Sequence, residues 1–306
     1  PQQGPDGNEE PGIQVSRASN WHGEPLGRVG RGNESRYKQG PAKKETQIHS
    51  MTTIIRYSSL FFLLTLIGSN CLAQRLDPTY RNLRYSKEFD RSVLDLWAVE
   101  GKKPAPLVVY FHGGGFKGGD KSFFSRSSML RRHYPKGVAF ASVNYPFLVH
   151  VDKDYLKIMK HCAEAVRFLQ AGAKKYNLDP DRISLSGGSA GALIACYVGH
   201  AEKLGIRSIF PVQQPMGTPL LTIPFLRRDG PPIFVYNRSG RNDRVHHPDN
   251  ALFVKKQCDL LGVKCTAYGS KGSGLPVLPE GEDVNDLAMN FFRVSWKKTS
   301  EKKNRK

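Results

Sequence analysis

The sequence lacks several features that define particular classes of protein. Its five cysteines form no CxxC pair and no Cys/His set with the spacing of a metal site, so no metal site is expected. The phosphate-binding pattern GxxxxGK[ST] is absent, and so is any motif of a nucleic-acid-binding module. The 30 glycines and 20 prolines follow no repeat, which excludes a collagen-like chain. An apolar content of 39% excludes a wholly disordered one.

No apolar run is long enough to cross a membrane. The run at residues 60–68 has about half of the ~20 residues that a spanning helix needs. It lies between the basic Arg56 and the small residue Ala73, in the order typical of a secretory signal peptide that begins at Met51. We predict a signal peptide over residues 51–73, cleavage before Gln74, and a secreted or periplasmic protein without stable membrane insertion. A signal anchor or a buried core helix is the alternative interpretation.

The two ends of the chain are expected not to fold. Residues 1–50 show no apolar period of 2 or 3.6 residues and cannot bury enough surface to offset their ordering entropy. Because a signal peptide begins at the initiator Met, we expect this disordered upstream extension to be absent from the natural product. Residues 297–306 hold six Lys or Arg in ten positions, which predicts a basic, disordered tail.

The basic excess belongs to the part of the chain that folds. Residues 1–73 hold 8 of the 46 Lys and Arg and 6 of the 27 Asp and Glu, which leaves a net charge of +17 on residues 74–306. Such a charge attracts polyanions. For an exported protein, an anionic polysaccharide or a component of the cell envelope is a better partner than nucleic acid. A solvated basic surface without a partner is the alternative.

Residues 74–296 alternate between strand-like and helix-like patterns. Strands are predicted at 93–99, 107–111, 138–143, 182–185, 208–212, 233–236 and 263–268, and helices near 123–133, 154–176, 190–204, 248–261 and 284–296. This alternation predicts one α/β domain with a doubly wound, mostly parallel sheet. In such sheets, functional groups gather beyond the carboxyl ends of the strands.

Two glycine-rich motifs follow predicted strands. In Gly187-Gly188-Ser189-Ala190-Gly191, the serine occupies a tight strand-to-helix turn where the N–H of Ala190 and the helix dipole face any negative oxygen beside its hydroxyl. In His112-Gly113-Gly114-Gly115-Phe116, three glycines expose N–H groups without Cβ obstruction. We expect Ser189 to be a nucleophile and Gly114, Gly115 and Ala190 to donate to an oxyanion. His112 is expected to shape its loop. A glycine-rich turn with a bystander serine is the alternative.

Together, HGGGF and GGSAG resemble the α/β-hydrolase fold, in its esterase/lipase branch with an HGGG oxyanion loop and a GxSxG nucleophile elbow. The segments PLVVYFHGGGFKGGDKS and LDPDRISLSGGSAGA are similar to that branch too, and the resemblance covers about residues 76–296. It implies carboxylic ester hydrolysis by a Ser, a His and an Asp, with no cofactor. The family pattern places the acid at Asp243, after the next-to-last strand.

The resemblance fails at the expected base. The family pattern has a histidine after the last strand, where this chain has Ser273, and no histidine follows His247. A hydroxyl cannot act as a base near neutral pH. Either His246 or His247, just after Asp243, supplies the imidazole, or both face solvent and the base is missing. Adjacent side chains point in different directions, so at most one of them can serve.

These residues support two hypotheses of different classes. The first is an exported serine esterase with a minimal cap that acts on small acyl esters, including acetylated carbohydrate. Only 53 residues separate Ser189 from Asp243, which leaves no room for a large helical lid and disfavours long-chain lipid substrates. The second is a catalytically impaired pseudo-hydrolase that binds an anionic glycan or a component of the cell envelope.

Export would permit disulfides. Cys162 and Cys196 fall on apolar faces of predicted helices and are expected to be buried thiols. Cys258 and Cys265 flank a helix-to-strand turn and are the candidate pair, although the sequence does not rank the pairings.

Overall fold

The structure, a computed structural model, describes residues 75–303, with side chains up to Lys297. The predicted extension at 1–50, the signal peptide at 51–73 and its cleavage site before Gln74 lie outside the described residues. Within residues 75–303, no helix is long and apolar enough to cross a membrane.

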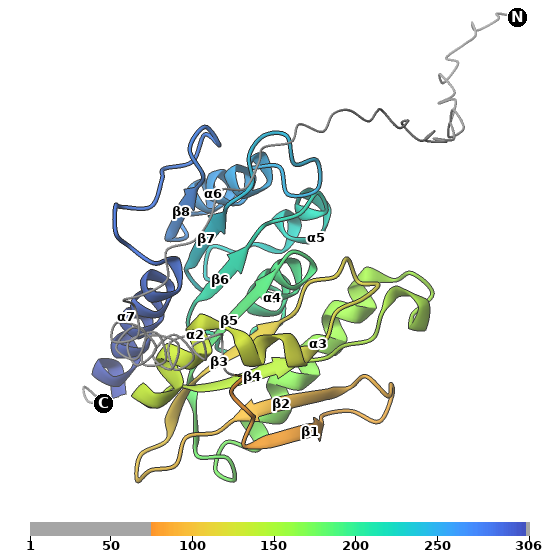
Figure 1. Cartoon of the computed structure of the whole chain (residues 1–306), viewed down its shortest axis with the longest axis vertical. Helices are drawn as coiled ribbons and strands as arrows, with labels where there is room; N and C mark the ends of the chain where they lie inside the picture. Colours follow the sequence, from red (N-terminus) through yellow and green to blue (C-terminus); the bar gives the residue numbers. More distant parts are fainter. Residues whose placement is uncertain (1–74, 304–306) are drawn as a thin grey trace, which may run out of the picture. The chain divides into compact units, whose positions relative to one another are not determined.

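An eight-stranded sheet forms the centre of the fold, in the order β1-β2-β4-β3-β5-β6-β7-β8 (Figure 1). β1 and β2 pair antiparallel, β2 pairs antiparallel with β4, and all later pairs are parallel. The strand bounds are Tyr80–Arg84 (β1), Val93–Trp97 (β2), Ala105–Phe111 (β3), Ala139–Val143 (β4), Leu178–Gly188 (β5), Ile209–Val212 (β6), Ile233–Asn237 (β7) and Cys265–Gly269 (β8). This doubly wound, mostly parallel sheet confirms the predicted fold class.

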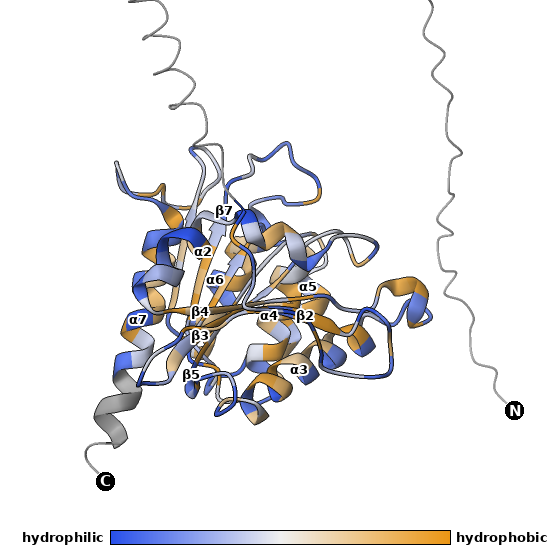
Figure 2. Cartoon of the chain, turned by 60° about the horizontal axis from the view of Figure 1, so that its bottom comes forward, coloured by the Kyte–Doolittle hydropathy of each residue, from blue (hydrophilic) through white to orange (hydrophobic). Residues whose placement is uncertain are grey.

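Helices cover both faces of the sheet. Their bounds are Ser128–His133 (α2), Tyr155–Ala171 (α3), Ala190–His200 (α4), Thr218–Leu221 (α5), Asp249–Leu261 (α6) and Val284–Lys303 (α7). Short 3₁₀ turns lie at Lys121–Arg126 (η2), Tyr134–Lys136 (η3), Leu148–His150 (η4) and Ile223–Phe225 (η5). Figure 2 shows α2 and α7 on one side of the strands and α3 and α4 on the other.

The central strand β3 shows why its sequence is apolar without a break. Leu107, Val109 and Phe111 join the core cluster that includes α3, α4 and α6. Val108 points to the opposite face and joins the cluster with α2 and α7. Because both faces are covered, five of the seven residues of β3 are buried and two are half-buried, and the period-2 alternation of a half-exposed strand is lost.

Several predicted boundaries were wrong. The strand predicted at 182–185 extends over Leu178–Gly188, the helix predicted at 190–204 ends at His200, and three further helices differ. The helix near 123–133 is divided into η2 and α2, because Asp120 caps the 3₁₀ turn and Ser127 adopts an extended conformation between the two. α3 ends at Ala171 rather than at 176, and Gly172 forms its C-cap. α7 continues to Lys303, so the disorder predicted for 297–306 does not begin at 297. No Gly or Pro stands between 297 and 303 to end the helix.

The edge strand β1 was not predicted at all. Its sequence, YRNLR, buries only part of two side chains, and a register shift interrupts its pairing with β2.

The four cysteines of the described part are free thiols: Cys162, Cys196 and Cys258 are buried, and Cys265 is half-buried. The pairing considered for Cys258 and Cys265 is therefore not present.

Candidate active site

Ser189 lies at the sharp turn between β5 and α4. Its φ of +54° and ψ of −118° are outside the usual regions for a residue with a side chain, a strain that concentrates at functional positions. A Cβ on Gly187 would collide with the carbonyl of Gly191, and a Cβ on Gly191 would collide with the carbonyl of Phe111. Close backbone packing therefore requires the glycines of the GxSxG pattern and fixes Ser189 at the start of α4.

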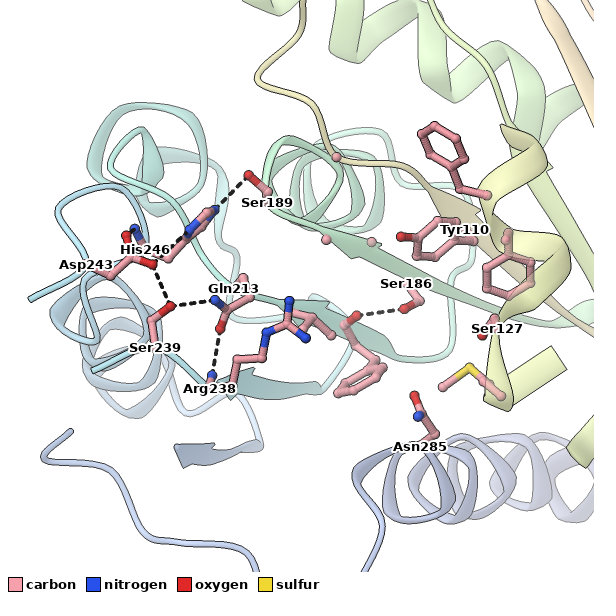
Figure 3. Close-up of a pocket in the computed structure, with 18 residues that line it drawn as sticks. Tyr110, Ser127, Ser186, Ser189, Gln213, Arg238, Ser239, Asp243, His246 and Asn285 are labelled. Carbon is pink, nitrogen blue, oxygen red and sulfur yellow. Dashed lines mark hydrogen bonds and ion pairs between the residues drawn. The ribbon is translucent and has the colours of Figure 1, made fainter. Parts of the chain in front are cut away.

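His246 supplies an imidazole to this serine. The loop between β7 and α6 brings its Nε2 to 2.9 Å from Oγ of Ser189, and its Nδ1 lies 3.3 Å from Oδ2 of Asp243 (Figure 3). A carboxylate only accepts, so Nδ1 carries the proton and Nε2 is free to accept from the serine hydroxyl. Ser189, His246 and Asp243 thus form a continuous hydrogen-bonded series.

Asp243 is held as an anion. Its Oδ1 accepts the N–H groups of Val245 at 3.0 Å and His246 at 2.8 Å, and its Oδ2 accepts the hydroxyl of Ser239 at 2.6 Å. The N–H of His246 and the hydroxyl of Ser239 hold the pKa of the Asp243 carboxyl well below its usual value. The carboxylate can therefore orient the imidazole and stabilise it when protonated.

A second layer of polar groups, which the sequence analysis missed, holds this loop in place. Gln213 donates from Nε2 to Oγ of Ser239 at 2.7 Å and accepts the N–H of Arg238 on Oε1 at 2.6 Å. The buried Asn237 donates to the carbonyl of His246 at 3.0 Å. Gln213 has a φ of +58°. The sequence offered one signal for these residues, their position at the carboxyl ends of strands. Gln213 directly follows β6, Asn237 ends β7, and Arg238 and Ser239 come next.

His247 does not reach the serine. Its Nδ1 lies 3.3 Å from the carboxylate of Asp249, in the first turn of α6. Ser273 is fully buried after β8, where its hydroxyl accepts the N–H of Leu275 at 3.2 Å. Neither residue lines the pocket around Ser189. The structure therefore brings together Ser189, Asp243 and His246, and leaves His247 and Ser273 elsewhere.

The HGGG loop lies beside the serine. A Cβ on Gly113 would be 2.9 Å from the carbonyl oxygen of Gly188 and 3.3 Å from Cβ of Ser189, so only glycine allows this approach. Within the described residues, the N–H groups of Gly113, Gly114, Gly115 and Ala190 donate no hydrogen bond. Gly113, which was not among the expected donors, lines the pocket, whereas Gly114, Gly115 and Ala190 do not.

His112 shapes this loop from behind. Its ring stacks on Tyr145, with centroids 4.3 Å apart, and its Nδ1 donates to the carbonyl of Gly113 at 2.7 Å. Burial lowers the pKa of His112 to about 4, so the ring is neutral at neutral pH. The role expected for it from the sequence, loop shaping by hydrogen bonding, agrees with these contacts.

A pocket of about 620 Å³ opens at Ser189. Aromatic and aliphatic side chains form one part of its wall: Tyr110, Phe123, Phe124, Met129, Phe210 and Val212. Polar side chains from three loops and from the first turn of α7 also line it: Ser127, Gln213, Arg238 and Asn285. Arg132 of α2 binds Asp283 at 2.8 Å and Asp286 at 2.6 Å, which fixes the start of α7 and with it Asn285. No three His, Cys, Asp or Glu side chains are grouped as a metal site within residues 75–303.

Two sequence comparisons match parts of this chain. A family model described as BD-FAE matches residues 94–208. Esterase LipI of Mycobacterium tuberculosis is 28% identical over 99 residues, which are 32% of this chain and 30% of that protein. The chain thus matches under a third of the length of this curated relative.

Solved structures extend the similarity to most of the described residues. A truncated carbohydrate esterase from gut microbiota superposes with a TM-score of 0.59 at 16% identity, covering 71% of this chain and 96% of that one. Esterase B of Lactobacillus rhamnosis gives 0.59 at 17%, covering 83% and 98%. Esterase 2 of Thermogutta terrifontis, phosphonylated by cyclosarin, gives 0.52 at 16%, covering 71% and 92%. The chain has the α/β-hydrolase fold, and its resemblance to the esterase/lipase branch is confirmed.

Proposed function

We propose that this protein is a serine carboxylic ester hydrolase. The observation that carries the proposal is the 2.9 Å contact between Nε2 of His246 and Oγ of Ser189, at a strained strand-to-helix turn. An imidazole in that position can accept the serine proton as the hydroxyl attacks an ester carbonyl. The relatives named esterases support the same reaction class.

The reaction follows from the positions of the groups. Oγ of Ser189 attacks the carbonyl carbon while His246 takes its proton, and Asp243 stabilises the imidazolium. The N–H groups of Gly113 or Gly114 and of Ala190 then stabilise the oxyanion. His246 returns the proton to the leaving alcohol, and a water molecule, activated by the same imidazole, hydrolyses the acyl-enzyme. In this scheme His246 supplies the base that the family pattern places at position 273.

Small acyl esters, with acetylated carbohydrate among them, are the proposed substrates. The link between Ser189 and Asp243 contains only α4, β6, the four-residue α5, the three-residue η5 and β7, so this link provides no large lid over the pocket. Polar side chains such as Ser127 and Asn285 can bind hydroxyl groups of an alcohol portion. The carbohydrate esterase among the structural relatives supports this class.

Hydrolysis of a chromogenic acetate ester by the purified chain tests the reaction class. We expect turnover that Ser189→Ala reduces to the buffer rate. Equal release by the wild-type protein and Ser189→Ala would instead favour the pseudo-hydrolase that binds an anionic glycan or envelope component. What supports the enzyme over that alternative is the imidazole within hydrogen-bond reach of Ser189.

Export stays a proposal of its own. Expression from Met51 in a Gram-negative host should yield a periplasmic protein whose N-terminus is Gln74, because the segment before it has the order of a signal peptide. N-terminal sequencing measures this. Retention of Met51 would contradict the secreted or periplasmic assignment.

A further inference from the structure

We propose that Arg238 binds a carboxylate on the alcohol portion of the ester, which makes the natural substrate an acylated hydroxy acid such as an acylated sugar acid. This inference rests on the proposed esterase function and adds the charge of its substrate.

The first observation is the position of Arg238. It directly follows β7 and lines the same pocket as Ser189. Figure 3 shows its side chain extending from the side of Gln213 toward the middle of the pocket-lining residues. The backbone N–H of Arg238 donates a 2.6 Å hydrogen bond to the side chain of Gln213, whose amide also donates to Ser239. The base of the side chain is therefore tied to the same network that holds Asp243.

The second observation is that the guanidinium has no anionic partner. Among the described residues, no carboxylate forms an ion pair with Arg238, whereas Arg241 of the same loop lies 3.4 Å from the carboxylate of Asp249. The one carboxylate in the pocket is Asp243, which already accepts from two N–H groups and the Ser239 hydroxyl and faces His246. The exposed guanidinium of Arg238 thus has no ion-pair partner among the described residues.

The third observation places that charge relative to the ester. His246 must donate its proton to the leaving alcohol, so the alcohol portion lies on the side of the loop that follows β7. Arg238 comes from this same loop. The oxyanion donors come from other segments, after β3 and at the start of α4. A group bound by Arg238 therefore belongs to the alcohol rather than to the small acyl group.

The fourth observation is chemical. A guanidinium presents parallel N–H donors that match the two oxygens of a carboxylate, and such charge-assisted pairs are the strongest hydrogen bonds in proteins. The neighbouring hydroxyl and amide groups of Ser127 and Asn285 suit an alcohol that carries further hydroxyls. A sugar acid combines both features. The net charge of +17 on residues 74–306 would also attract such a substrate at long range.

Two substrates of nearly equal shape test the proposal: 4-acetoxybenzoate, which carries a carboxylate on its alcohol portion, and 4-acetoxybenzamide, which does not. We expect Arg238→Gln to lower kcat/KM for 4-acetoxybenzoate by about tenfold to a hundredfold, the size of a charge-assisted hydrogen bond. The same variant should change kcat/KM for 4-acetoxybenzamide by less than about threefold. Arg238→Glu should prefer the amide.

Arg244→Gln is the matched control, because Arg244 is exposed on the same loop and does not line the pocket. It removes the same charge and should leave the ratio of the two substrates unchanged. An unchanged ratio in Arg238→Gln, or an equal change in Arg244→Gln, would overturn the role of Arg238 while leaving the esterase function intact.

If the wild-type protein hydrolyses neither ester, a binding measurement still tests carboxylate recognition by Arg238 independently of the proposed esterase function. In the Ser189→Ala protein, calorimetric titration with 4-hydroxybenzoate and 4-hydroxybenzamide reports recognition without turnover. We expect the acid to bind at least about tenfold more tightly than the amide, and Arg238→Gln to abolish the difference. Equal affinities for the two compounds would contradict the assignment of Arg238.

Discussion

Nε2 of His246 lies 2.9 Å from Oγ of Ser189, and only two residues separate this histidine in sequence from Asp243, which its other ring nitrogen faces at 3.3 Å. The proposed acid and base thus come from a single loop between β7 and α6. The carboxylate of Asp243 also accepts the backbone N–H of His246, so the residue that orients the ring also fixes the backbone that carries it. One loop can therefore replace the two that the family pattern uses.

Asp243→Asn should lower kcat for a chromogenic acetate ester by about 10³- to 10⁴-fold. The change removes the charge that stabilises the imidazolium and leaves the ring without a carboxylate to fix its tautomer. Steady-state kinetics measure it. Asp249→Asn is the matched control, because Asp249 contacts His247 rather than His246 and should leave kcat within about threefold. Comparable losses in both variants would contradict the assignment.

Ser239→Ala should lower kcat by about tenfold with little change in KM. The Ser239 hydroxyl donates to Asp243 at 2.6 Å and accepts from Gln213, so its removal leaves the carboxylate with one hydrogen bond fewer. It acts on the carboxylate and not on the ester, so the loss should appear in kcat. Ser239→Thr keeps the hydroxyl and should restore most of the rate. A raised KM with unchanged kcat would place Ser239 in substrate binding instead.

Ser273→His should not create a working base. Ser273 is fully buried, and its hydroxyl lies so close to Gly269 that a Cβ there would stand 2.5 Å from it. An imidazole at this position would overpack the site and destabilise the fold by about 1–3 kcal/mol. We expect a lower midpoint in urea unfolding and no recovery of activity when the change is combined with His246→Ala. Recovered activity would show that the loop after β8 can still reach Ser189.

The stability of the fold should fall on acidification from about pH 6.5 to pH 4. Burial lowers the pKa of His112 to about 4, and burial together with the charge of Arg227 lowers the pKa of His200 to about 4. In the unfolded chain both titrate near pH 6.5, so between these values the unfolded state binds more protons and stability decreases as pH falls. Each histidine contributes on the order of 1 kcal/mol per pH unit in this window. Urea midpoints that stay constant from pH 7 to pH 5 would contradict this.

Much of the fold was predictable because its strongest signals are local. The unbroken apolar run of β3 and the glycines around Ser189 and Gly113 follow from close packing with near neighbours in the sheet. The edge strand β1 was missed because it buries little surface and carries no periodic signal. Its existence depends on pairing with β2, which the sequence of β1 alone does not show.

The candidate site was predictable only in part. Sequence order placed Asp243 after β7 and restricted the base to two adjacent histidines. The choice between His246 and His247 depends on the backbone path into α6, where His247 turns to Asp249. Gln213 and Arg238 could not be connected, because the hydrogen bond between them joins loops 25 residues apart.

The rate of covalent labelling by a fluorophosphonate measures whether His246 activates the Ser189 hydroxyl, because labelling requires an activated serine but not the natural substrate. The measurement compares the wild-type protein, His246→Gln and His247→Gln, with Ser189→Ala to locate the label. We predict that His246→Gln lowers the second-order rate constant by at least about a hundredfold, the contribution of a general base, and that His247→Gln changes it by less than about threefold. A His246→Gln protein that is labelled at the wild-type rate, or a loss of labelling rate confined to His247→Gln, would contradict the assignment of His246 as the base.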